Sequence, residues 1–163
     1  MFRLYVLVAV VSALLAACTT APRFDTAGID AAMTPAAVTA RPQASTGHQV
    51  LWGGVIVAAT NLRDATELQI LAYPLNRAQR PKVGAPPLGR FIAVRRGYLE
   101  TVDFAPGRQV TVTGPVEGLR PGHVGQMRYL FPVVSVRGLY LWPRDETATE
   151  PQMHFGIGVI LHN

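Results

Sequence analysis

Hydrophobic and polar residues alternate along much of the second half of this chain, and a period of two predicts strands rather than helices. The clearest alternation spans residues 109–116, and residues 67–73 alternate almost as well. Residues 50–59 are nearly continuously apolar and contain Gly53 and Gly54 side by side, which predicts a bulge or sharp bend within a strand.

Further strands are predicted at residues 89–94 and 153–161, and residues 127–142 predict one long strand or two shorter ones. The segment 77–87 holds three prolines and a glycine, so we expect a loop there. No stretch has apolar residues spaced three and four positions apart over the length of a helix. We therefore expect an all-β domain, either a sandwich or a small barrel, and barrel closure would remove exposed strand edges.

The N-terminus has the pattern of an export signal. Arg3 is followed by an apolar run to Leu15, shorter than the ~20 residues of a membrane-spanning helix, and then by Ala16, Ala17 and Cys18. Leu-Ala-Ala-Cys resembles the lipobox of bacterial lipoprotein precursors. In those proteins a diacylglyceryl group alkylates the thiol, the chain is cut before the cysteine, and the new amine is acylated.

Cys18 is the only cysteine of the chain, so it cannot form an internal disulfide, and we expect it to be lipidated. More than one acyl chain gives stable anchoring. The residue after the cysteine is Thr19 rather than the Asp that retains lipoproteins in the inner membrane, which points to the outer membrane. No second apolar run of spanning length follows, so we expect an anchored protein.

Composition predicts three regions. Residues 1–17 are the signal peptide, and residues 18–46, rich in Ala, Thr and Pro, are expected to form the lipidated N-terminus and a flexible tether, with room for a short helix near 27–33. Residues 47–163 are richer in β-branched and aromatic side chains, and about 117 residues are enough for one domain.

Charge and motifs give little support for catalysis. The basic residues behind the net charge of +5 are almost all arginines, which are spread along the chain and form no run. This pattern fits a solvated surface and also contact with anionic phosphates such as those of lipopolysaccharide. The serines lie in no nucleophile elbow, the histidines have no metal-ligand spacing, and no glycine-rich phosphate loop is present. We expect no enzyme, no catalytic residue and no metal site.

Several short motifs, in order, resemble the Slp family of outer-membrane lipoproteins, which is named for a starvation-inducible lipoprotein. They are Val50-Leu51-Trp52-Gly53-Gly54, Tyr73-Pro74-Leu75, Gly89-Arg90-Phe91, Gly107-Arg108, Tyr129-Leu130-Phe131-Pro132 and Leu141-Trp142. The chain departs from the family pattern at Thr101, where proline is common, and at Pro87, where serine is expected. Nothing after Trp142 matches.

The resemblance implies a small antiparallel β-barrel, closed or partly open and related to the OB type. It also implies an outer-membrane, lipid-anchored location and a structural or stress-related role in the cell envelope, linked to starvation and stationary phase. Diacylglyceryl and N-acyl groups on Cys18 would be its only cofactors. The outer membrane would be reached through these acyl chains, other envelope proteins or lipopolysaccharide are candidate partners, and nucleic acid is not expected.

A second interpretation is a small-ligand or glycan-binding envelope module. Aromatic rings at Trp52, Trp142, Tyr73 or Tyr98 would be the stacking surfaces. Exposed rings gathered in one cleft with Arg90 and Arg108 would favour this interpretation, and burial of the rings would count against it. The contact residues it proposes are Trp52, Arg90, Arg108 and Trp142.

Overall fold

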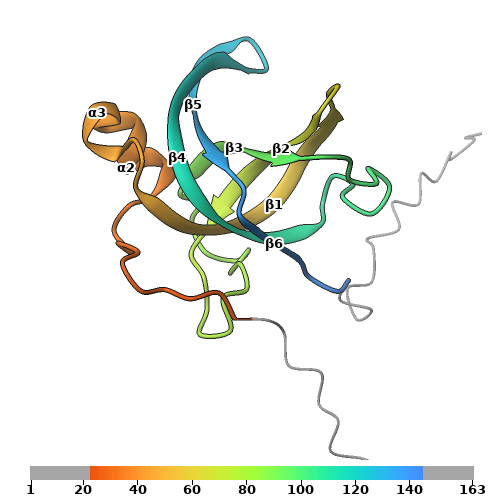
Figure 1. Cartoon of the computed structure of the whole chain (residues 1–163), viewed down its shortest axis with the longest axis horizontal. Helices are drawn as coiled ribbons and strands as arrows, with labels where there is room; N and C mark the ends of the chain where they lie inside the picture. Colours follow the sequence, from red (N-terminus) through yellow and green to blue (C-terminus); the bar gives the residue numbers. More distant parts are fainter. Residues whose placement is uncertain (1–22, 145–163) are drawn as a thin grey trace, which may run out of the picture.

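Six strands and two short helices make up the part of the chain that the computed structural model describes, residues 23–144 (Figure 1). The helices are α2 (Pro35–Ala40) and α3 (Pro42–Ser45), and the strands are β1 (Gln49–Asn61), β2 (Ala65–Tyr73), β3 (Gly89–Arg96), β4 (Gln109–Val124), β5 (Met127–Ser135) and β6 (Gly138–Leu141). The strands predicted from 50 to 142 are confirmed, with 127–142 forming two strands. The predicted strand at 153–161 lies outside the described residues.

The strands close into a ring. Their order is β1-β2-β3-β5-β4, and β4 pairs with β1 again, so these five strands close on themselves. β6 pairs with residues 110–113 of β4, on the edge opposite β1. Neighbouring strands are antiparallel except β3 and β5, which are parallel. A closed ring of five strands with this mixed pairing has the architecture of the OB type. The prediction of an all-β, OB-like barrel is confirmed.

Two adjacent glycines allow β1 to serve two neighbours. Residues 49–55 of β1 pair with β4, and residues 53–61 pair with β2, so the strand turns from one to the other around Gly53 and Gly54. A Cβ atom on Gly54 would run into the carbonyl group of Leu71. One on Gly53 would lie 2.9 Å from the Val110 carbonyl oxygen. The predicted bend is confirmed, while the register shift itself lies further along, between Ile56 and Ala58.

Side chains from the five strands of the ring fill the barrel interior. Burial alternates strictly along β2, and Trp52 meets Phe91 edge to face across the interior with ring centroids 5.0 Å apart. The fully buried side chains of this core include Val50, Ile56, Leu68, Ile70, Phe91, Val110, Val112, Val116 and Val134. At one end the β4–β5 hairpin extends beyond the ring (Figure 1).

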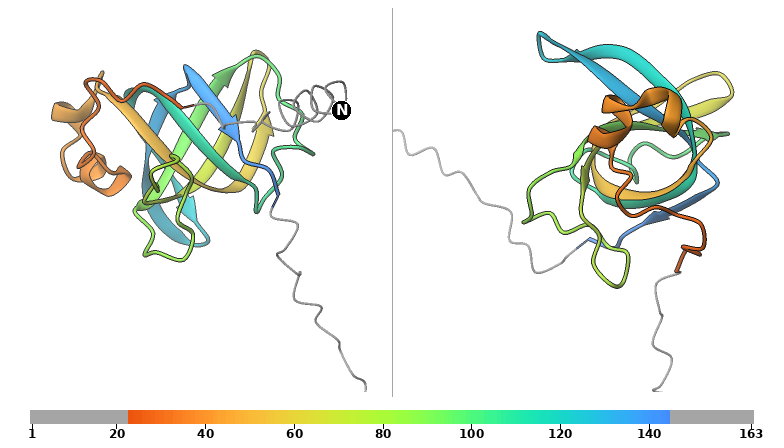
Figure 2. Two further views of the ribbon diagram at one scale, coloured as in Figure 1. Left: turned by 90° about the horizontal axis from the view of Figure 1, so that it is seen from below. Right: turned by 90° about the vertical axis from the view of Figure 1, so that its left-hand side faces the viewer.

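The N-terminal segment, residues 23–46, packs against the barrel, although a flexible tether is expected there from composition. Helices α2 and α3 lie across one end of the ring, as the right-hand view of Figure 2 shows. Val38 of α2 is fully buried in the core. The Thr34 hydroxyl accepts a hydrogen bond from the Ala37 N–H and caps α2. The helix considered near 27–33 is not formed; the helices begin at Pro35.

Candidate functional site

An open cleft of about 750 Å³ lies between the N-terminal segment and the barrel wall. The side chains of Leu51, Trp52 and Tyr73 on β1 and β2 line its barrel side. The N-terminal segment supplies its other wall, with Phe24, Ile29 and Met33, and the β2–β3 loop closes one end. This volume is in the range of small-molecule pockets, and the lining is mostly apolar.

Gln79 ties the β2–β3 loop to the N-terminal segment. Its side-chain carbonyl accepts from the Phe24 N–H at 2.8 Å, and its amide donates to the Phe24 carbonyl at 2.9 Å. The backbone of Gln79 has φ 64°, and its carbonyl accepts a 2.6 Å hydrogen bond from the Thr111 hydroxyl. The loop is thus fixed to β4 on one side and to the start of the described chain on the other.

The turn that carries Gln79 is itself stabilised by Asn76. The Asn76 side-chain oxygen accepts from the N–H groups of Ala78 and Arg80, an Asx turn that places Gln79 in the left-handed region. Gln79 was not among the residues predicted from the sequence. Asn76, three residues earlier, signals a turn, but the hydrogen bonds from Gln79 to Phe24, 55 positions away, leave no local signal.

Trp52 and Trp142, both predicted as contact residues, are buried, each with 6% of its surface exposed. The Trp52 indole N–H donates to the Met33 carbonyl at 2.6 Å, and the ring borders the cleft. The Trp142 indole N–H donates to the Thr111 hydroxyl at 2.9 Å. Since Thr111 alternates with the core residues Val110 and Val112, Trp142 packs on the outer side of β4, away from Trp52.

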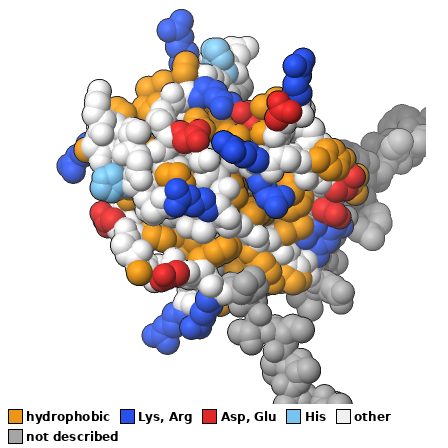
Figure 3. Space-filling model, viewed as in Figure 1, with side chains coloured by type: hydrophobic (Ala, Val, Ile, Leu, Met, Phe, Trp, Pro, Cys, Tyr) orange, Lys and Arg blue, Asp and Glu red, His pale blue; other side chains and the backbone are white. Residues whose placement is uncertain are grey.

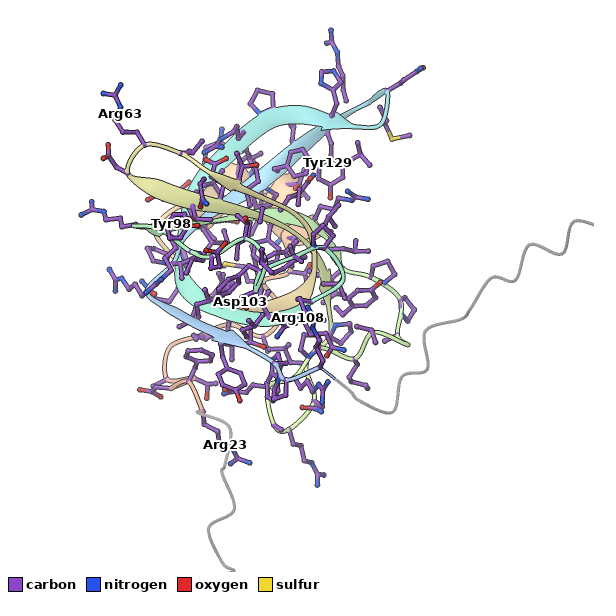
Figure 4. The ribbon with its side chains drawn as sticks, turned by 90° about the vertical axis from the view of Figure 1, so that its right-hand side faces the viewer. Arg23, Arg63, Tyr98, Asp103, Arg108 and Tyr129 are labelled. Carbon is purple, nitrogen blue, oxygen red and sulfur yellow. The ribbon has the colours of Figure 1, made fainter. Side chains whose placement is uncertain are left out.

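Arg108 lies beside Trp142, whereas Arg90 lies elsewhere. The Arg108 guanidinium donates to the carbonyl oxygens of Asp103 at 2.7 Å and of Trp142 at 3.0 Å, so it joins two loops; Figure 4 shows Arg108 close to Asp103. Arg90, half-buried on β3, donates its backbone N–H to the Tyr129 hydroxyl at 2.8 Å. The four predicted contact residues therefore do not gather in one cleft.

Of the two tyrosines considered as stacking surfaces, Tyr73 lines the cleft and Tyr98 is 67% exposed on a separate loop. The Tyr98 hydroxyl donates to the Glu100 carboxylate at 2.9 Å. That hydrogen bond raises the pKa of Tyr98 above its ordinary value because it favours the protonated phenol. In Figure 4 Tyr98 lies on the side of Arg63, far from Arg23.

A second cavity, of about 500 Å³, lies along the β4–β5 hairpin. Its lining includes Gly122, His123, Arg128 and Tyr129. Met127, at the turn of the hairpin, is 71% exposed. The hairpin therefore presents both an apolar tip and basic side chains to its surroundings.

Charged side chains are scattered over the surface. On the face shown in Figure 3, basic and acidic side chains alternate with apolar ones. Arg120 and Glu67 form an ion pair at 2.6 Å that joins the hairpin to β2. Among residues 23–144 no three His, Cys, Asp or Glu side chains lie close enough to hold a metal ion. No helix in the same range has the length and apolarity to cross a bilayer.

The solved structures that resemble this chain are OB-type proteins with low sequence identity to it. A small single-stranded DNA-binding protein from Streptomyces coelicolor aligns with 58% of this chain and 94% of its own, at 10% identity and a TM-score of 0.37. A likeness this low carries no argument about function.

Sequence comparisons are more informative. The chain is 37% identical over 114 residues to the Escherichia coli lipoprotein YeaY and 30% identical over 106 residues to the E. coli outer membrane protein Slp. These alignments cover 70% and 65% of this chain but only 58% and 56% of the relatives, so the chain spans little more than half their length. The model of the outer membrane lipoprotein Slp family matches residues 15–158. The chain belongs to the outer membrane lipoprotein Slp family.

Proposed function

We propose that this lipoprotein is cut before Cys18, anchored by diacylglyceryl and N-acyl groups on that residue, and acts as a non-enzymatic structural component of the envelope. The observation that carries the proposal is the Leu15-Ala16-Ala17-Cys18 sequence, together with a family match that begins at Leu15. Acyl chains buried in the bilayer contribute about 0.8 kcal/mol per methylene, which makes a multiply acylated N-terminus a stable anchor.

The side chains predicted as ligand contacts support a structural role. Trp52, Trp142 and Arg108 use their N–H groups on carbonyl or hydroxyl oxygens of the same chain. A group that is already satisfied internally gains little from a ligand, because a new hydrogen bond would replace an existing one. The link to starvation and stationary phase rests on the family resemblance alone. We further propose other envelope proteins or lipopolysaccharide as partners, and no nucleic acid.

The anchor is tested by expressing the protein and a Cys18→Ala variant in a Gram-negative host. Intact mass should show loss of residues 1–17 and added acyl groups for the native protein only. Outer-membrane fractionation should be lost in the variant. An unmodified native protein in the soluble fraction would overturn the anchor.

For the stress role, a deletion strain should lose viability under carbon starvation and recover it with the native gene but not with the Cys18→Ala gene.

The cleft supports a second candidate function, a binding module for a small ligand with an apolar body. Trp52 and Tyr73 border the cleft, and Arg77 lies at its rim. Ala31 lines the cleft and neighbouring Ala32 does not, although both are exposed. Ala31→Trp should therefore block binding of the fluorescent sulfonate 1-anilinonaphthalene-8-sulfonate, while Ala32→Trp should not. Equal binding by the two variants would rule the cleft out as the binding site.

A further inference from the structure

The described chain is held on the barrel almost from its first residue. The backbone of Phe24 makes two hydrogen bonds with the Gln79 side chain, at 2.8 and 2.9 Å. Its ring lies so close to Gly138 that a Cβ atom there would come within 2.6 Å of the ring edge. Since Gln79 is itself bound to Thr111 of β4, Phe24 is fixed to the barrel wall.

Few residues remain between this fixed point and the proposed anchor. Cys18 and Phe24 are six positions apart in the sequence. A chain extends at most ~3.3–3.6 Å per residue, so the barrel wall at Phe24 cannot lie more than about 20 Å from the lipidated cysteine. A flexible tether to residue 46 would have allowed a reach several times longer. The short connection constrains which part of the barrel can face the membrane.

One end of the molecule carries both the start of the described chain and the turn that holds it. Figure 1 shows the first residues of the described chain and part of the β2–β3 loop at the bottom, and the β1–β2 and β4–β5 hairpins toward the top. Figure 4 agrees, with Arg23 at the lower end and Arg63 of the β1–β2 turn at the upper end. Arg23 and Arg77 are exposed and both line the cleft.

We infer that this lower end, with Arg23 and Arg77, rests on the phospholipid headgroups of the leaflet that holds the acyl chains, and that the β4–β5 hairpin points away from that surface. The inference rests on the proposed lipidation of Cys18. A guanidinium group suits a phosphate because it donates two parallel hydrogen bonds. Asp25 and Asp30 lie on the same segment, and each carboxylate accepts a hydrogen bond from a nearby backbone N–H. These acidic groups offset the charge of the arginines, so the short connection to Cys18 contributes more to the orientation than net charge does.

This orientation also fixes what the hairpin faces. Exposed Met127 and the cavity bordered by His123 and Arg128 would face the compartment rather than the lipid. The cleft, in contrast, would open toward the membrane surface.

The test uses the lipidated protein with one engineered cysteine, because acylation consumes the thiol of Cys18. Ala78→Cys places a fluorophore beside Arg77, and Met127→Cys places it at the hairpin turn; both positions are exposed. The proteins are reconstituted in vesicles of phosphatidylethanolamine and phosphatidylglycerol that contain a headgroup-linked quencher. We expect quenching of the Ala78→Cys label to be several times stronger than that of the Met127→Cys label. Equal or reversed quenching overturns the orientation.

Two controls separate this inference from the anchor proposal. Flotation with the vesicles is measured first: failure to float overturns the lipidation and this inference with it, whereas flotation with equal quenching overturns the orientation alone. A flexible Gly-Ser insertion of twelve residues between Ala21 and Pro22 should remove most of the quenching difference, because it adds reach. The same insertion between Gly125 and Gln126 should leave the difference intact. A difference unaffected by the first insertion would show that the connection does not set the orientation.

Discussion

Gly54 of β1 faces the backbone of β2 at Leu71, where there is no room for a side chain. A Cβ atom would run into the Leu71 carbonyl group, which is held in a β-sheet hydrogen-bonding register and cannot move alone. Gly54→Ala should therefore lower the free energy of unfolding by about 3 kcal/mol, the upper part of the range for overpacking. Urea unfolding of the detergent-purified protein measures this value. Gly84→Ala is the control, since a Cβ there meets nothing within 4 Å, and should change stability by less than ~0.5 kcal/mol.

Gln79 combines a strained backbone with a side chain that holds Phe24, and two substitutions separate these contributions. Gln79→Ala and Gln79→Gly both remove the hydrogen bonds to Phe24, so amide exchange of the segment 24–33 should become faster in both. Glycine tolerates φ 64° without strain, so Gln79→Gly should be more stable than Gln79→Ala by about 1 kcal/mol in urea unfolding. Unchanged exchange in both variants would show that other contacts hold the segment.

At this scale the sequence predicted chain geometry better than it predicted contacts. The bend at Gly53 and Gly54 could be predicted because glycine pairs in an apolar run have few other uses. The contact residues Trp52 and Trp142 could not be separated from core residues, since an aromatic ring with one polar atom suits both environments. Their burial became clear only when the acceptors, Met33 and Thr111, were brought beside them by the fold.

The strands were predictable as elements because their period of two is local. Which strands would pair was not, and the parallel contact between β3 and β5 depends on closure of the whole ring. Helices α2 and α3 were missed because six and four residues are too short to show a helical stripe. Val38 is the one large apolar side chain within these two helices, and a single such residue gives no sign of its burial.

Helix α2 nevertheless contributes to the core through that residue, and its contribution can be measured. Val38→Ala should lower the free energy of unfolding by about 2 kcal/mol, from the lost burial of two methyl-sized groups and the cavity left behind. Val102→Ala makes the same chemical change on a side chain that is 72% exposed, and should alter stability by less than ~0.5 kcal/mol. If urea unfolding gave similar values for the two variants, α2 would not be packed on the barrel in solution.

At the scale of the whole molecule, the N-terminal segment and the barrel share one core and should unfold together. Three forms expressed without the signal peptide separate a folded segment from a passive tether: residues 19–163, 23–163 and 47–163. The first two should have the same stability. The third loses Val38 from the core and the Met33 carbonyl that accepts the Trp52 N–H, so it should lose at least about 3 kcal/mol. Water would also reach Trp52, and its fluorescence maximum should move to longer wavelength. Equal unfolding midpoints for all three forms would mean that residues 23–46 act only as a tether, and the short reach from Cys18 to the barrel would then no longer hold.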